Sequence, residues 1–206
     1  MANVLQGIDV SEHNGLIHWP GVASRMGMSG FAYLKATEGG RGVDRQYASN
    51  RAGANAQGLL SGAYHFFSPV TPVAQQVANF CDTVGSVKGD LPPMLDVEQP
   101  GLAQPDYAAA VAAWLQQVGD RLGCVPGIYT NARIWHDCVG AFTPFLAHPL
   151  WIAHYTPGPS PALPAGASSY AFWQFTDTGV VNGIAGPVDM SRFAGSAEQL
   201  QALRCG

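Results

Sequence analysis

Two carboxyl side chains lie two residues apart in the apolar segment Leu91–Gly101, LPPMLDVEQPG. Charged side chains are rarely buried without a partner, because removing them from water is costly. On a β-strand, alternate residues point to the same face, so we expect Asp96 and Glu98 to share one face and the intervening Val97 to occupy the other. The strand rise would place the Cα atoms of the two acids about 6.5–7 Å apart.

Such a pair suits acid/base chemistry on a glycosidic bond. Two neighbouring carboxylates repel each other when both are ionised, which raises the pKa of one of them. One group then donates a proton near neutral pH while the other remains an anion, as hydrolysis of a glycosidic bond requires. The alternative interpretation is an ordinary ion pair, in which Lys35 is the partner of an acid such as Asp9.

Other polar residues recur near the ends of the predicted strands. Short apolar runs predict strands over residues 5–10, 31–36, 61–67, 93–98, 125–130, 150–155, 170–175 and 187–190. Their polar residues are Asp9, Lys35, Glu38, His65, Asp96, Glu98, Tyr129, Asn131, His154, Tyr155, Gln174 and Asp189. In α/β barrels the carboxyl ends of the strands form the mouth, where reacting groups lie. The convergence of acids from three separate strands predicts a catalytic site there.

Helical periodicity separates the early strands. Thr71 and Pro72 predict an N-cap and a first-turn proline for a helix that continues to residue 84. Residues 105–122 repeat the pattern, with Gly123 as the predicted stop, and residues 20–26 and 44–57 are weaker helical candidates. Strands that alternate with helices predict a parallel sheet, closed as an α/β barrel with few helices in the last third. An open doubly wound sheet is the alternative.

Composition excludes several classes of protein. The 206 residues are 47% hydrophobic and 12% charged, which is typical of a globular protein with a large core. A net charge of −4 without a Lys/Arg cluster argues against a nucleic-acid partner. No apolar run is long enough to span a membrane, and the first ten residues lack the features of a signal peptide. No low-complexity linker divides residues 1–206, so we expect a single catalytic domain.

The aromatic residues and histidines require separate interpretations. We expect Tyr64, Tyr129 and Tyr155 to line a cleft that accepts sugar rings, and Lys35 and Gln174 to bind substrate at the same mouth. Trp114 and Trp173 are expected to be packing residues. A metal site formed by His13, His65, His154 and the acids is an alternative, but no HxH or HExxH spacing supports it. We therefore expect neither a metal nor another cofactor.

The four cysteines, Cys81, Cys124, Cys138 and Cys205, have no zinc-like spacing. Four cysteines allow three pairings, and the sequence does not choose among them. In a chain of this size without a visible signal peptide, we expect free or mostly free thiols. Cys205, next to the C-terminus, is expected to be exposed.

Eight segments together resemble the Chalaropsis-type muramidases, glycoside hydrolase family 25. They are GIDVSEHNG, FAYLKATEG, SGAYHFF, LPPMLDVE, GIYTN, LWIAHY, FWQFTDTG and GPVDMSRF, in order from Gly7 to Phe193. The resemblance implies a (β/α)5(β)3 barrel that hydrolyses the β-1,4 bond between N-acetylmuramic acid and N-acetylglucosamine. By position, Glu98 would be the general acid and Asp96 would orient or stabilise the sugar. Asp9 and Asp189 match the other two acids of the family's active site.

The resemblance also implies a location. The expected partner is the glycan strand of peptidoglycan, attacked by a monomer outside the cytoplasm. Without a visible signal peptide, phage-type release or a dedicated secretion system is expected to deliver it. The wall-binding module that the family often carries is not seen.

Three alternatives remain open. A chitinase-like hydrolase would use similar acids, but its DxxDxDxE pattern is absent because residues 91–95 contain no acid. A catalytically inactive, wall-binding barrel would keep the fold and the aromatic cleft. Within the muramidase interpretation, the 2-acetamido group of the substrate would assist a retaining reaction. Inversion, with Asp9 or Asp189 as the base, is its rival.

Overall fold

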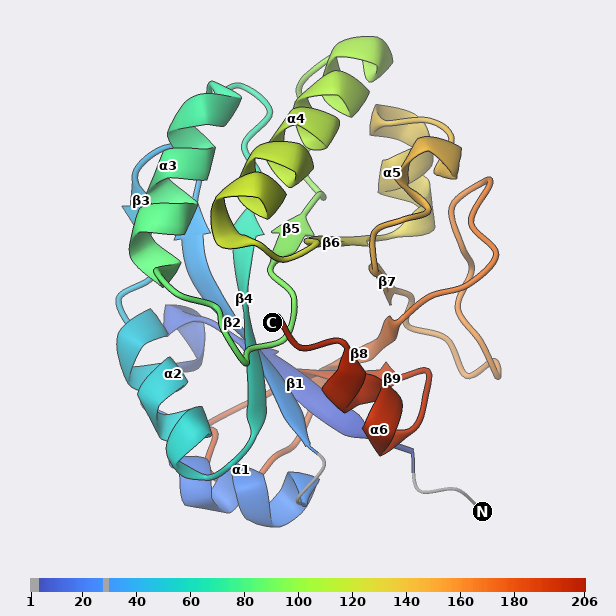
Figure 1. The fold of residues 1–206 in the computed structure, drawn as a ribbon. Coiled ribbons are helices and arrows are strands. Elements are labelled where there is room, and N and C mark those ends of the chain that lie inside the picture. The colour runs from blue at the N-terminus through green and yellow to red at the C-terminus, as the bar shows by residue number, and fades with distance from the viewer. Residues whose placement is uncertain (1–3, 28–29) are drawn as a thin grey trace.

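The protein folds as a closed barrel with helices around it, seen in Figure 1. This computed structural model describes residues 4–27 and 30–206. The strands in these residues are β1 (Gln6–Val10), β2 (Phe31–Glu38), β3 (Gly42–Val43), β4 (Leu60–Phe66), β5 (Met94–Asp96), β6 (Gly127–Thr130), β7 (Leu150–Ala153), β8 (Phe172–Gly179) and β9 (Val188–Phe193). The α-helices are α1 (Trp19–Met26), α2 (Tyr47–Ala56), α3 (Val73–Val84), α4 (Gln104–Leu122), α5 (Ala132–Cys138) and α6 (Ala197–Ala202). Single 3-10 turns span Glu12–Asn14 and Thr143–Phe145.

Pairing of β1 with β2 closes the sheet into a barrel. The order around it is β1, β9, β8, β7, β6, β5, β4 and β2, and β3 forms a short hairpin with the carboxyl end of β2. Five strand–helix units precede the three consecutive strands β7, β8 and β9, so the predicted (β/α)5(β)3 barrel is confirmed. All eight predicted strands are present, whereas β3, α5 and α6 were not predicted.

The last strand runs against its neighbours. β9 is antiparallel to both β8 and β1, while the pairs from β1–β2 around to β7–β8 are parallel. The amino-terminal end of β9 therefore lies at the same rim as the carboxyl ends of the parallel strands. This reversal determines which of its residues reach the mouth of the barrel.

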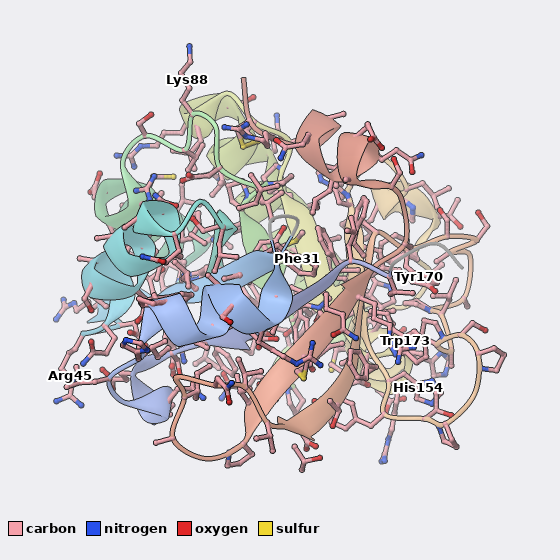
Figure 2. The ribbon with its side chains drawn as sticks, turned by 90° about the horizontal axis from the view of Figure 1, so that it is seen from below. Phe31, Arg45, Lys88, His154, Tyr170 and Trp173 are labelled. Atoms are coloured by element: carbon pink, nitrogen blue, oxygen red, sulfur yellow. A yellow bond between two sulfur atoms is a disulfide. The ribbon has the colours of Figure 1, made fainter. Side chains whose placement is uncertain are left out.

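Strand alternation creates two buried layers. Residues such as Leu95 and Val97 face outward and pack in one cluster with Phe80 of α3 and Trp114 of α4. A second cluster fills the barrel interior. It contains the aromatic residues Phe31, Tyr33, Trp151 and Phe172, together with Met94. Viewed from below in Figure 2, Phe31 lies near the middle of the molecule. Trp114 and Trp173 are buried, as predicted for packing residues.

The predicted end of α4 is correct, whereas the predicted start of α3 is not. Gly123 ends α4 with φ of 66°, the left-handed conformation that glycine adopts without steric cost. At the start of α3 the predicted cap was wrong, because Pro72 occupies the N-cap position and no side chain caps the helix. The Thr71 hydroxyl instead donates to Ser68 Oγ at 2.9 Å. No helix in the described residues has the length and apolar character needed to cross a membrane.

The expectation for the cysteines was partly wrong. Cys124, just after α4, forms a disulfide with Cys205, and Cys205 is buried rather than exposed. Cys205 is brought there because its N–H donates to Asp90 O and its carbonyl accepts from Gly89 N, both at 2.9 Å. The partners are 81 residues apart, so their proximity depends on the complete fold. Cys81 and Cys138 are buried free thiols.

Removing the disulfide is expected to destabilise the barrel without changing its architecture. The double variant Cys124→Ser/Cys205→Ser should lose about 2–4 kcal/mol of unfolding free energy, because the unfolded chain regains the entropy of an open loop. Denaturant unfolding monitored by tryptophan fluorescence measures this loss. Reductant should lower the stability of the wild type toward that of the variant and leave the variant unchanged. Equal unfolding free energies for the oxidised wild type and the variant would contradict this role.

Candidate active site

The predicted acids gather around one pocket at the mouth of the barrel. The pocket has a volume of about 160 Å³ and is lined by Asp9, Ser11, His13, Lys35, Tyr64, Phe66, Asp96, Glu98, Tyr129, Trp151, Gln174 and Asp189. Of the predicted site residues, Tyr155 alone lies outside this lining. It borders an adjoining recess of about 510 Å³, which Glu98 and Tyr129 also line. The structure thus brings together the residues predicted from separate strands, and their chemical roles stay predictions.

Asp96 and Glu98 reach the pocket from one short segment. β5 ends at Asp96, so Glu98 lies beyond the strand rather than on it as predicted. The alternation nevertheless continues, because Val97 is fully buried among outward-facing residues. The segment is held on both sides of Glu98. Thr130 Oγ1 donates to Val97 O at 2.8 Å, and Tyr107 OH donates to Gln99 O at 2.7 Å.

Asp9 and Asp189 face each other across the seam of the barrel. The antiparallel register pairs Asp9 of β1 directly with Asp189 of β9. Asp189 is the second residue of β9, and it reaches the mouth because this strand runs in the opposite direction. The sequence prediction placed Asp189 at the mouth because it expected carboxyl ends of strands there. In the structure Asp189 lies near the amino-terminal end of β9, and the reversed direction of this strand brings it to the mouth. The negative charge of Asp189 adds to burial in raising the pKa of Asp9.

Gln174 connects three of the predicted residues. Its Nε2 donates to Asp9 Oδ2 at 2.9 Å. Its Oε1 accepts from Tyr129 OH at 2.9 Å and from Tyr155 OH at 2.8 Å. The amide therefore presents its donor to the acid and its acceptor to the two phenols. This network fixes Asp9 and Tyr129 in the lining of the pocket and ties them to Tyr155 of the adjoining recess.

Burial dominates the electrostatics of the four acids. Desolvation is the largest cause of a raised pKa at Asp9, Asp96, Glu98 and Asp189. Repulsion adds to it, from Asp189 at Asp9, from Glu98 at Asp96 and from Asp189 at Glu98. The pocket therefore retains protons at a pH at which exposed carboxyl groups have lost theirs. A retained proton is what a general acid needs near neutral pH.

Asp96 has an unused hydrogen-bonding atom. Its Oδ1 is buried and makes no hydrogen bond within the described residues. A buried acceptor without a donor costs free energy, and such atoms are rare in folded proteins. Asp96 lines the pocket, so its carboxyl group still has hydrogen-bonding capacity for a bound molecule with an N–H or O–H group.

Lys35 is the cation of the pocket. Its Nζ forms an ion pair with Glu38 Oε2 at 2.8 Å and lies 4.8 Å from the centre of the Phe66 ring. The alternative ion pair of Lys35 with Asp9 is not the one that forms. The positive charge of Lys35 lowers the pKa values of Glu98 and Asp96, against the stronger effect of burial.

The histidines do not assemble into a metal site. His65 points outward from β4 and is fully buried, with Nδ1 2.7 Å from Thr37 Oγ1 and Nε2 3.0 Å from Gln76 Oε1. It was grouped with residues at the mouth, whereas strand alternation places its neighbour Tyr64 there. His154 lines the adjoining recess, and His13 lines the pocket. Within the part of the chain described, no three His, Cys, Asp or Glu residues are arranged to hold a metal ion.

Three lining residues, Phe66, Trp151 and Ser11, were missed in the sequence, and His13 was considered only as a metal ligand. Phe66 and Trp151 follow from strand alternation, because Phe66 shares a face with Tyr64, and Trp151 is two residues before Ala153 of the adjoining recess. The Trp151 indole donates to Ser191 Oγ at 3.0 Å and is thereby fixed at the floor. Ser11 and His13 lie in the turn after β1, where no periodicity marks a direction.

Comparison with known proteins places these observations in a family. Residues 8–184 match the profile of Glycosyl hydrolases family 25. Over 204 residues the chain is 39% identical to Uncharacterized protein YegX of Escherichia coli O6:H1, an alignment that covers 97% of this chain and 73% of the relative. It is 36% identical to Lysozyme M1 of Streptomyces globisporus over 97% of this chain and 71% of the relative.

The fold agrees with that of a solved lysozyme structure. The bacterial lysozyme of Streptomyces coelicolor superposes with a TM-score of 0.92 and 34% sequence identity, over 99% of this chain and 98% of that one. The similarity thus extends over the whole barrel and includes every strand that contributes a predicted acid. The chain belongs to glycosyl hydrolase family 25 and is a glycoside hydrolase of the lysozyme type.

Proposed function

We propose that the protein hydrolyses the β-1,4 bond between N-acetylmuramic acid and N-acetylglucosamine in peptidoglycan, acting as a monomer at the cell wall. Glu98 is the general acid and then the general base, and Asp96 orients the 2-acetamido group of the sugar. The observation that carries the proposal is the buried, unpaired Oδ1 of Asp96 beside Glu98 in one pocket. Relatives named as a lysozyme and as an N,O-diacetylmuramidase support the substrate class.

The proposed reaction uses the substrate as the nucleophile. The acetamido N–H donates to Asp96, which turns the acetamido carbonyl oxygen toward the anomeric carbon. That oxygen forms a bond to the anomeric carbon while the glycosidic C–O bond breaks, and Glu98 gives its proton to the leaving oxygen. Water then attacks the anomeric carbon, opens the oxazolinium ring and returns a proton to Glu98. Two displacements at one carbon give net retention of configuration.

Substrate binding would also favour protonation of Glu98 over protonation of Asp96. In the free pocket, burial raises the pKa of both Asp96 and Glu98, so the pair competes for retained protons. An N–H donor to Asp96 favours its ionised form. The proton then resides on Glu98, which also lines the adjoining recess where a leaving sugar has room. Binding of the acetamido group and protonation of the acid are thus coupled.

The inverting alternative uses Asp9 or Asp189 to activate water. Asp9 is less suited to that role, because its carboxyl group already accepts from Gln174 and lies against Asp189. A base must be free to accept a proton from water. We therefore assign Asp9 and Asp189 to the electrostatic environment of the reacting sugar. The chitinase-like alternative differs in substrate and is separated by the fragments released.

Replacing Glu98 is expected to abolish hydrolysis. Glu98→Gln should lower the rate of fragment release by about 100-fold or more, because an amide cannot donate and recover the proton. The measurement is mass spectrometry of borohydride-reduced fragments from purified peptidoglycan. Glu198→Gln is the matched control, since Glu198 is exposed on α6 and lies outside the pocket lining.

The sugar at the reduced end of each fragment identifies which glycosidic bond was cleaved. Fragments that end in reduced muramic acid, made by wild type and Glu198→Gln but not by Glu98→Gln, are the expected result. Fragments that end in reduced glucosamine would replace the proposal with a glucosaminidase. Release of fragments from chitin but not from peptidoglycan would favour the chitinase-like alternative. Equal rates for Glu98→Gln and wild type would remove Glu98 from the mechanism.

The positive charge of Lys35 should lower the pH at which activity is lost on the alkaline side of the pH profile. Lys35 lowers the pKa of Glu98, so Lys35→Met should raise that pKa and move the alkaline limb of kcat/KM to higher pH. The position of the limb is informative even if the rate falls for other reasons. Lys88→Met is the control, because Lys88 extends from the outer edge of the molecule in Figure 2. An alkaline limb that stays in place or moves to lower pH would contradict this electrostatic role.

A further inference from the structure

A second cavity adjoins the acid pocket on the side of β2. It has a volume of about 660 Å³ and lies between the β2–β3 hairpin (38–44), residues 68–75, the turn at Glu12 and His13, and Gln99. We call it the hairpin recess. His13 and Lys35 line both the hairpin recess and the acid pocket, so the two spaces are adjacent.

The walls of the hairpin recess are held by side chains that do not themselves line it. Asn79 Nδ2 donates to both Gly39 O and Gly42 O at 3.0 Å, which ties the hairpin to α3. Gln76 Nε2 donates to Ser68 O and Thr71 O at 2.9 Å, which fixes the segment before α3. Figure 1 shows β3 and α3 next to each other. Walls fixed in this way reduce the entropy lost when a ligand binds.

The hairpin recess is polar and carries both signs of charge. Among the described residues no Phe, Tyr or Trp lines it, whereas Tyr129 and Tyr155 line the recess on the other side of the pocket. Lys35 is paired with Glu38, and Glu12 with Arg45. Arg41 is exposed at the hairpin and takes part in none of the ion pairs of the described residues. Its guanidinium is therefore available to an anion.

We propose that the hairpin recess binds the peptide stem of the muramic acid unit held in the acid pocket. This inference rests on the proposed function. The stem is attached to the muramic acid ring through a lactyl ether, and it carries free carboxylates and amide groups. The recess offers it a cation at Arg41, together with amide and hydroxyl side chains such as Gln75, Gln99 and Ser68. A sugar ring would instead favour the aromatic recess on the opposite side.

The test compares glycan with and without its peptide. Arg41→Glu should raise KM by about threefold or more on peptide-bearing peptidoglycan and leave KM unchanged on the same glycan after an amidase has removed the stems. Arg25→Glu is the matched control, because Arg25 is exposed on α1, lies outside both cavities and gives the same change in net charge. Affinity for a peptide-bearing and a peptide-free muramyl disaccharide is measured in parallel with Glu98→Gln, which keeps the ligands intact.

The outcomes separate this inference from the proposed function. An Arg41→Glu effect confined to peptide-bearing ligands, in KM and in affinity, supports the peptide site. Equal losses on both ligands would assign the recess to glycan and overturn it. Equal effects of Arg41→Glu and Arg25→Glu, or no effect of either, would also overturn it. If the wild type cleaves neither substrate, the proposed function fails, while the affinities still decide whether the recess takes peptide.

Discussion

The withdrawal of four carboxyl groups from water is the constraint on which the site depends. Asp9 shows how the fold imposes it. Its backbone is paired with Tyr33 of β2 on one side and with Asp189 of β9 on the other, so it stands at the seam that closes the barrel. The barrel cannot close without bringing the two aspartates together. Asp96 and Glu98 then complete the pocket from β5 and the segment that follows it.

This arrangement favours chemistry at the expense of stability. Burial raises the pKa values of these acids in the folded chain above those in the unfolded chain. The folded state therefore loses stability as the pH rises from the unfolded pKa through the folded one, since ionisation costs more inside the pocket. The rest of the barrel must offset this cost. The stacked rings of Tyr33 and Trp151 lie inside the barrel, and the Cys124–Cys205 disulfide tethers the chain terminus. A site that works by retained protons thus requires a rigid scaffold.

The sequence predicted the parts of the structure that follow from local periodicity. The eight strands were predicted from short apolar runs and the four helices from a period of 3.6, and all of these elements are present in the fold. The approach of Asp96 and Glu98 to one pocket follows from the alternation of side chains along a strand. Features that depend on contacts between distant segments of the chain could not be predicted in this way. Neither the reversed direction of β9 nor the pairing of Cys205 has a local signal, because each depends on which segments meet after the barrel closes. His65 was misplaced because strand ends were inferred without assigning the inward face.

The configuration of the first product tests the proposed mechanism most directly. Proton NMR of the new reducing end, recorded before mutarotation, distinguishes the two anomers when a soluble muramyl oligosaccharide is cleaved. Assistance by the acetamido group, with Asp96 as its acceptor and Glu98 as the acid, predicts that the β-anomer forms first and converts slowly to the equilibrium mixture. Initial formation of the α-anomer would contradict it and would assign the activation of water to Asp9 or Asp189.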